Sequence, residues 1–306
     1  MQKLALLLVI LFIGCSKTKE NKKNEIKPSN KITETVKEPI RENIIQIDST
    51  KTIDSTENKL VIDSMKINVL RDTVLKEITV NKVSIKKEGI KIRPDHVAWD
   101  VLTKKYVSSK GKVNYNGLKS ELHTIDAYLL HLQKTPPKND WSKNEKLAYW
   151  FNLYNAATIH LIASSYPVKS IRDINGGKPW DQKFIKSGNQ IYSLNEIENT
   201  IVRPNFNEPR LHVAFNCAAV SCPKLLKGAF FSSKLNRQLT TLANAWVNDP
   251  TKNKVTENSI EISKIFEWYG IDFKKGVISF IKPYTTIDIK ENAAITYLEY
   301  DWKLND

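Results

Sequence analysis

All seven tryptophans of this 306-residue chain lie after residue 98, and this uneven distribution limits where a folded core can form. Large aromatic side chains supply much of the apolar surface that a domain buries on folding. Residues 16–93 are instead rich in Lys, Glu, Asn, Thr and Ser, and they contain one glycine, Gly89. Such a segment cannot bury enough apolar surface to offset the conformational entropy lost on ordering. We therefore predict a disordered tether over residues 16–93 and one globular domain over residues 94–306.

Residues 1–15 resemble the signal peptide of a bacterial lipoprotein. Lys3 precedes an unbroken apolar stretch over residues 4–13, which is shorter than the about 20 residues of a membrane-spanning helix. The stretch has the length and the flanking residues of a signal-peptide h-region. Residues 12–15, Phe-Ile-Gly-Cys, are similar to a lipobox, in which a small residue precedes the lipid-modified cysteine. We expect lipid on Cys15 to anchor the mature protein in a membrane of the cell envelope, facing the periplasm or the exterior.

The net charge of +14 raises the question of a nucleic-acid partner. The excess of basic residues is spread over both halves of the chain, and no Arg-rich or aromatic-interleaved stripe is present. We therefore predict no nucleic-acid partner. Contact with anionic lipid or cell-wall polymer explains the basic surface better, and the expected partners are a cell-wall peptide or an envelope protein. No cofactor is predicted.

Residues 142–145, Ser-Lys-Asn-Glu, have the form of a capping box and predict a helix that continues to about Ser164. The helix is apolar on nearly all sides, which predicts that it is buried. Asn152 and Asn155 fall on one stripe of small residues, within an arc of about 80°. An unpaired buried amide costs about 1–3 kcal/mol, so both must find partners. Either they bind the backbone of a loop, or they border a polar pocket and orient a reacting group.

A second capping box, Ser193 to Glu196, predicts a short helix that ends at Arg203-Pro204. Residues 210–216 then alternate in the manner of a strand. One face is apolar, and the other carries Arg210, His212, Ala214 and Asn216. A cation, an imidazole and an amide on one buried face indicate either a function or a dense hydrogen-bond network. Arg210, Asn216 and Asn155 are therefore candidate binding residues.

Cys217 follows at the predicted end of that strand, where a loop of small residues begins. A thiol is an effective nucleophile only as thiolate, so it needs an imidazole or a helix N-terminus nearby. His212 is the nearest imidazole in sequence. On a regular strand the two side chains would face opposite sides, and the loop would have to redirect the thiol. Asn216, Asn152 or Glu198 would then orient the imidazole.

Two structural interpretations compete with a reactive Cys217. Lipidation of Cys15 would leave two cysteines, Cys217 and Cys222, in an oxidising compartment, where a disulfide could close the short loop. That bond would prevent Cys217 from acting as a nucleophile, unless the bond is itself redox-active. His212, Cys217 and Cys222 also offer three metal ligands. Their spacing is not a familiar zinc pattern and no fourth ligand is evident, so we predict no metal site.

Four blocks of the sequence resemble, in order, the domain-of-unknown-function family 547. They are LAYWFNLYNAATIHL, KPWDQKFIKSGNQIYSLNEIENTIVRP, EPRLHVAFNCAAVSCPKL and Tyr300-Asp301-Trp302, and they span most of residues 94–306. The family pattern covers Asn152, Asn155 and Glu198, while Asn199 stands where the family has a histidine. It also covers Arg210, His212, Asn216 and Cys217. Plant members resemble it at Cys217 but lack a counterpart of Cys222, which counts against a disulfide as the family's common purpose.

The residues and the resemblance together predict an α+β fold, with a helical first half packed on a mostly antiparallel sheet with further helices. The closing aromatic residues Tyr297, Tyr300 and Trp302 are expected to pack in the core. The predicted function is a Cys-dependent hydrolase or acyl transferase that acts on a peptide or amide bond. Cys217 would be the nucleophile and His212 the general base, while Glu198 and Asn152 would complete the catalytic set. The alternative is a non-catalytic module that binds an envelope ligand or partner in the same pocket.

Overall fold

The computed structural model describes residues 92–306. The predicted signal peptide with Cys15, and all but the end of the predicted tether, lie outside these residues. Within the described range the fold is α+β, as predicted, with helices before and between the strands of two small sheets. No helix of this range has both the length and the apolar character needed to cross a membrane.

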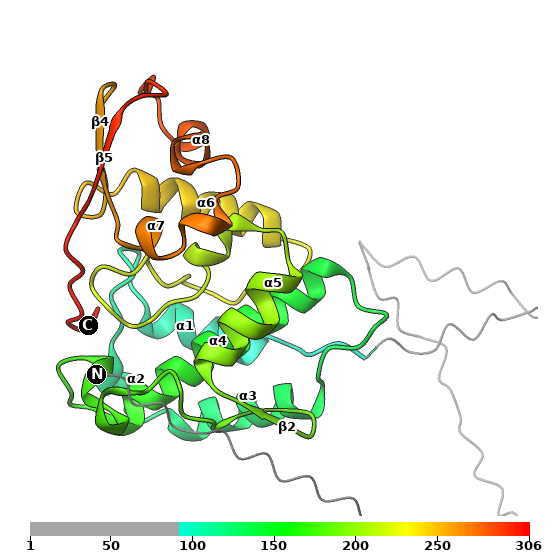
Figure 1. The fold of residues 1–306 in the computed structure, drawn as a ribbon. Helices are drawn as coiled ribbons and strands as arrows, with labels where there is room; N and C mark the ends of the chain where they lie inside the picture. The colour runs from blue at the N-terminus through cyan, green and yellow to red at the C-terminus, as the bar shows by residue number, and fades with distance from the viewer. Residues whose placement is uncertain (1–91) are drawn as a thin grey trace, which may run out of the picture. The chain divides into compact units, whose positions relative to one another are not determined.

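The first half of the described chain is helical and is built around one long central helix (Figure 1). This helix, α4, spans Lys143–Ser165, and three shorter helices lie beside it or beside one another: α1 (Val97–Tyr106), α2 (Tyr115–Lys119) and α3 (Leu122–Lys134). The predicted capping box is present, because Ser142 Oγ accepts from the Glu145 amide at 3.2 Å and the Glu145 carboxylate accepts from the Ser142 amide at 2.6 Å. The helix ends before Tyr166, so both predicted ends of this helix are confirmed.

The second half combines short helices with the two sheets. The helices are α5 (Arg203–Asn205), α6 (Leu235–Val247), α7 (Ile265–Trp268) and α8 (Val277–Ile281). One sheet pairs β1 (Ile185–Ser187) with β2 (Gln190–Tyr192) in antiparallel fashion. In the other, β4 (Ser259–Ile262) lies between β3 (Lys254–Val255), which is antiparallel to it, and β5 (Ala294–Tyr297), which is parallel. Short 3₁₀ helices complete this half: η1 (Ile171–Asp173), η2 (Asn175–Gly177), η5 (Gly270–Asp272) and η6 (Lys282–Tyr284).

The strand predicted over residues 210–216 is wrong. Pro209–Val213 forms a 3₁₀ helix, η4, and the chain turns immediately after it. Pro209 favours a helical first position, and the Glu208 carboxylate caps the helix by accepting from the Arg210 amide at 3.2 Å. This segment is covered on more than one side, since His212 and Asn216 are buried together with the apolar residues. The alternating pattern therefore marked a buried segment but not its backbone geometry.

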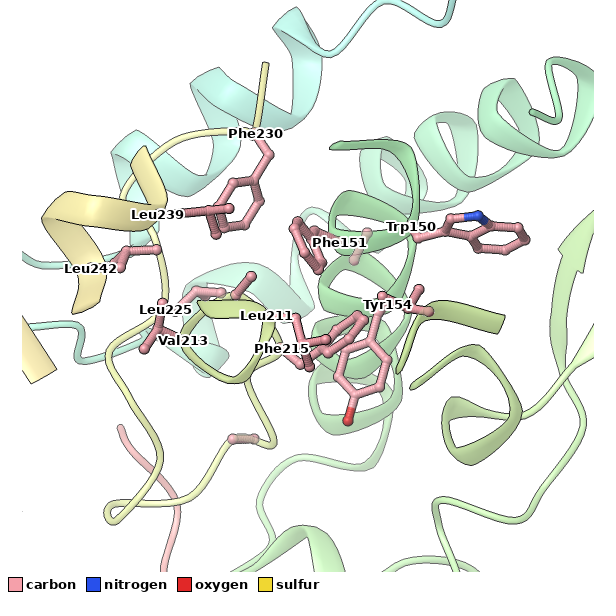
Figure 2. Packing of buried hydrophobic residues seen from close by; sticks show 14 of the residues in the cluster. Trp150, Phe151, Tyr154, Leu211, Val213, Phe215, Leu225, Phe230, Leu239 and Leu242 are labelled. Carbon is pink, nitrogen blue, oxygen red and sulfur yellow. The ribbon is translucent and has the colours of Figure 1, made fainter. Parts of the chain in front are cut away.

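Aromatic packing fixes this segment against α4. Phe215 contacts Phe151 and Tyr154 of α4, with ring centroids 5.0 Å and 4.6 Å away respectively. Figure 2 shows these rings facing one another, with Phe230 on the far side of Phe151. Edge-to-face and tilted aromatic pairs of this kind add stability beyond the area that they bury. Phe215 therefore holds the backbone two residues before Cys217 in a defined position.

Candidate functional site

The amide of Asn155 holds the chain that leads to Cys217. Its Nδ2 donates to the Ala214 carbonyl at 2.7 Å, and its Oδ1 accepts from the Asn216 amide at 2.9 Å. Asn155 is buried, so both hydrogen bonds satisfy groups that water does not reach. Of the two interpretations for this amide, the structure shows the binding of a loop backbone, and the loop is the one that carries the candidate nucleophile.

Asn152 makes the same kind of contact with a different segment. Its Nδ2 donates to the Phe230 carbonyl at 2.8 Å, and its Oδ1 accepts from the Phe230 amide at 2.9 Å. The side chain is fully buried. Because the Phe230 backbone engages both polar atoms, the predicted role of Asn152 in orienting His212 finds no support in the geometry.

The loop after Asn216 folds back on itself and brings two thiols together. Asn216 Oδ1 accepts from the Ala218 amide at 3.0 Å, and its Nδ2 donates to the Pro223 carbonyl at 2.8 Å. Ala218 has a φ of 62°, which turns the chain sharply in the left-handed region. Cys217 and Cys222 are free thiols with their sulfur atoms 3.1 Å apart, and the Cys217 amide also donates to Cys222 Sγ at 3.1 Å.

These contacts make the two thiols unequal. The hydrogen bond from Cys222 outweighs the effect of burial and holds the pKa of the Cys217 thiol below its usual value. Tyr300, whose hydroxyl lies 3.1 Å from Cys217 Sγ, lowers that pKa further. Burial and the neighbouring Cys217 raise the pKa of Cys222 well above its usual value. Cys217 Sγ donates to Cys222 Sγ while both thiols are protonated. Cys217 ionises first, and its thiolate then accepts a hydrogen bond from Cys222, which keeps its proton.

His212 is oriented by a carboxylate that is distant in sequence. Its Nε2 lies 2.8 Å from Asp272 Oδ2, and its ring packs against the tilted ring of Tyr269 with centroids 4.4 Å apart. Arg203 Nε donates to the same Asp272 oxygen at 2.6 Å. Burial raises the pKa of Asp272, but the hydrogen bonds from His212 and Arg203 outweigh it and lower that pKa to about 2. Asp272 is therefore a carboxylate at neutral pH, and it fixes the imidazole through a charge-assisted hydrogen bond.

Glu198 lies on a π-helix, η3 (Glu196–Val202), which leads directly into α5. The predicted capping box at its start is confirmed by two hydrogen bonds between Ser193 and Glu196, of 2.9 Å and 3.0 Å. The helical segment continues past the predicted end to Asn205, because Pro204 lies in the first turn of α5, where its missing amide hydrogen is tolerated. Burial raises the pKa of Glu198, and the Tyr154 hydroxyl donates to Glu198 Oε2 at 3.3 Å. A π-helix is rare and is often found at functional sites.

These groups open into one cavity of about 400 Å³. Its wall includes Cys217, Cys222, His212 and Glu198, together with the aromatic residues Tyr154, Trp180, Phe215, Trp268, Tyr269, Tyr300 and Trp302. The 3₁₀ helix η4 and the turn after it explain why Cys217 and His212 share this cavity rather than facing opposite sides, as the strand had implied. The partners of the Cys217 sulfur within residues 92–306 are Cys222 and Tyr300, and His212 forms no hydrogen bond with it there.

Two predicted roles need correction. Arg210 does not line this cavity, because its guanidinium binds Glu208 at 2.7 Å and the side chains of Asn236 and Thr240 on α6. Tyr300 and Trp302 line the cavity and are only partly buried, so they are not simply core residues.

Two residues of the candidate site, Asp272 and Arg203, were not predicted from the sequence. Asp272 has no local motif, since it contacts His212 across 60 positions of the chain. Arg203 lies in the block that ends in Ile-Val-Arg-Pro, which was a usable signal. The Tyr300-Asp301-Trp302 block was a usable signal for Tyr300. As for a metal, residues 92–306 contain no group of three or more His, Cys, Asp or Glu side chains placed to hold one.

Comparison with known proteins gives a match to a protein family. The model of a family described as a protein of unknown function, DUF547, matches residues 138–247. The match supports the resemblance seen in the sequence blocks. It includes α4, Glu198, His212 and both thiols, whereas Asp272 and Tyr300 lie beyond it. No curated protein and no solved structure matches the chain.

Proposed function

We propose that this protein is a cysteine-dependent hydrolase or acyl transferase of the cell envelope, anchored through Cys15, that acts on a peptide or amide bond. One observation carries the proposal: a free thiol with a lowered pKa and an imidazole oriented by a carboxylate line the same cavity. A nucleophile, a base and an orienting group are the components that thiol acyl transfer requires.

The proposed reaction has two steps. Cys217 Sγ, as thiolate, attacks the carbonyl carbon of the substrate, a C–S bond forms and the C–N bond breaks. His212, which has taken the proton of the Cys217 thiol, gives that proton to the departing amine. Water or an acceptor amine then attacks the thioester while His212 takes its proton, and Cys217 leaves as thiolate. The catalytic hydrogen bond between the two groups would form when substrate closes the site, as is common in enzymes without bound ligand.

The residues around this pair have distinct roles in the proposal. Asp272 is a positioning residue that holds His212 through Nε2 and leaves Nδ1 for the reaction. Burial raises the pKa of Glu198 and so favours its protonated form, whose O–H can donate to the substrate oxygen and stabilise negative charge there. Asn155 and Asn216 act through the backbone, because they fix the loop that presents the thiol.

Alkylation with iodoacetamide tests the state of the thiol. The full chain is labelled between pH 5 and 9, with and without reductant, and the labelled cysteines are identified by mass spectrometry. We expect Cys217 to react without reductant and at a pH below the range of an ordinary thiol. Cys222→Ala, which removes the hydrogen bond to Cys217, should raise the pH at which Cys217 reacts. Labelling that requires prior reduction, or that shows no low-pH reactivity, would rule out the nucleophile.

Acyl transfer is tested with an activated ester, p-nitrophenyl acetate. We expect a burst of p-nitrophenol, stoichiometric with protein, and an acetyl group on Cys217. Cys217→Ser should abolish the burst and Cys222→Ser should retain it.

The alternative, a binding module, is favoured by one observation, the 45% exposure of Trp268 beside the cavity. A protein that shows no burst, but whose tryptophan fluorescence responds to soluble peptidoglycan fragments, would be such a module.

A further inference from the structure

A second hollow adjoins the loop that carries the thiols. It has a volume of about 1020 Å³, and it shares Cys222 with the candidate site as a wall residue. Ala219 and Val220 of the same loop also line it, as does the closing segment 303–306. Backbone pairing joins these two walls, through the bridge between Ala219 and Leu304 and the hydrogen bond from the Val220 amide to the Lys303 carbonyl at 2.8 Å.

Lysine dominates the charge of this hollow. Its lining includes six lysines, two aspartates (Asp249 and Asp306) and no arginine; the lysines are Lys110, Lys112, Lys169, Lys224, Lys252 and Lys303. Lys252 lies 3.6 Å from Asp249 and donates to the Val220 carbonyl, and Lys112 donates to the Asp306 carbonyl. Among the ion pairs formed within residues 92–306, none includes Lys110, Lys169 or Lys224. The ammonium groups of Lys110, Lys169 and Lys224 therefore lie at one concave surface without a carboxylate partner among residues 92–306.

The backbone brings these lysines together from distant parts of the chain. Gly111 has a φ of +82°, and a Cβ there would lie 2.4 Å from Lys224 Cβ. Only glycine therefore lets the turn that carries Lys110 and Lys112 pack directly against Lys224. On another wall, the Leu304 amide donates to the Lys169 carbonyl at 3.0 Å. The clustering of charge thus follows from specific tertiary contacts.

We propose that this hollow, the lysine groove, is a binding site for an extended ligand that carries repeated phosphate groups. Lysine binds phosphate as a hydrated point charge, whereas arginine provides planar bidentate recognition. A groove with lysine and without arginine suits a flexible chain of phosphates better than one fixed anion. Unpaired cations at a concave surface also concentrate the local electrostatic potential, which attracts such a chain. A flexible chain can enter a concave surface, whereas the flat face of a bilayer cannot, so the groove favours a chain as its ligand.

Binding of inorganic polyphosphate to the full chain tests the proposal, measured by titration calorimetry over a range of salt concentrations. The variant Lys110→Glu/Lys169→Glu/Lys224→Glu should bind about 100-fold more weakly, since each basic residue contributes about 1 kcal/mol near a polyanion. The slope of log K against log salt should fall by about 2, because three fewer phosphate charges are neutralised. None of the three side chains forms an ion pair with residues 92–306, so the fold should tolerate the changes; thermal unfolding checks this.

The control variant is Lys138→Glu/Lys274→Glu/Lys275→Glu, which changes the net charge equally at exposed positions outside the lysine groove. Affinity that falls equally in both variants would show a general charge effect and overturn the proposal. So would a groove variant that loses binding to phosphatidylglycerol vesicles but keeps binding to polyphosphate. Cys217→Ser should bind polyphosphate like the parent chain, so the result does not depend on whether the proposed acyl transfer is correct.

Discussion

Asn152 and Asn155 lie three residues apart on α4. The side-chain amide of each uses both its nitrogen and its oxygen to form hydrogen bonds with the backbone of a distant segment. They differ in what that segment does. Asn152 holds Phe230, which packs in the core, whereas Asn155 holds the residues that precede Cys217. The same chemistry on one helix therefore serves packing at one position and site geometry at the other.

Alanine substitutions should separate these two roles. Asn155→Ala and Asn152→Ala should each lower the free energy of unfolding by about 2 kcal/mol, because each leaves buried backbone groups without partners. Only Asn155→Ala should also slow the alkylation of Cys217, by about tenfold or more, since its loop loses its position. Urea denaturation and iodoacetamide kinetics measure the two effects. Equal alkylation rates in the two variants would contradict the role given to Asn155.

Asp272→Asn tests the positioning of His212. The amide keeps the shape of the side chain but favours the wrong tautomer of the imidazole, and the burst rate with p-nitrophenyl acetate should fall by about 10²-fold or more. Cys217 should still react with iodoacetamide, because its pKa is set mainly by Cys222 and Tyr300. A burst rate equal to that of the parent chain would remove Asp272 from the mechanism.

At the scale of elements, the helices with local signals were predictable and the loops between them were not. Both capping boxes lie within four residues of sequence, and the structure has both. The segment η4 was predicted as a strand because its apolar and polar residues alternate. That alternation indicates burial, whereas Pro209 and the capping residue Glu208 favour a 3₁₀ helix. Asp272 could not be predicted, because its position depends on how η5 packs against η4. Local chemistry therefore pointed to His212, Cys217 and Glu198, which line one cavity, whereas the positions of Asp272 and Tyr300 depend on tertiary packing.

The buried carboxyl group on η3 has a consequence for stability. The pKa of Glu198 is raised in the folded protein, so its contribution to stability is complete below the pKa of the unfolded chain. It is lost as pH rises through the folded pKa. In the Glu198→Gln variant this side chain has no titrating group. The free energy of unfolding of the variant should therefore increase relative to that of the parent chain between pH 4 and pH 8. Urea unfolding across this range checks the prediction, and a pH-independent difference would contradict it.

At the scale of the whole described domain, charged contacts link segments that are far apart. Arg93 Nε donates to Glu145 Oε1 at 2.5 Å and so ties the residues before α1 to α4. Asp272 similarly joins η5 to η4 and α5 through His212 and Arg203. The hydrogen bond from Arg93 lowers the pKa of Glu145 to about 2, which is close to that of Asp272.

Both carboxylates should make the domain sensitive to acid. Each carboxylate has a lowered pKa in the folded state. Its contribution to the free energy of unfolding is therefore present above the pKa of the unfolded chain, which is 4.5 for Glu145 and 3.8 for Asp272. That contribution is lost as pH falls toward about 2. The double variant Glu145→Gln/Asp272→Asn should be less stable at pH 6 and should show a flatter decline in stability between pH 4.5 and pH 2. Parallel declines for the two proteins in urea unfolding would refute this assignment.

The contact between Cys217 and Tyr300 spans 83 positions of the chain, and that between His212 and Asp272 spans 60. A ribosome therefore makes the thiol and the imidazole well before it makes the phenol and the carboxylate that tune them. When the ribosome has just added Cys217, that residue is an ordinary cysteine with no assembled site around it. The contacts that tune Cys217 and orient His212 are therefore complete only after translation has passed Tyr300.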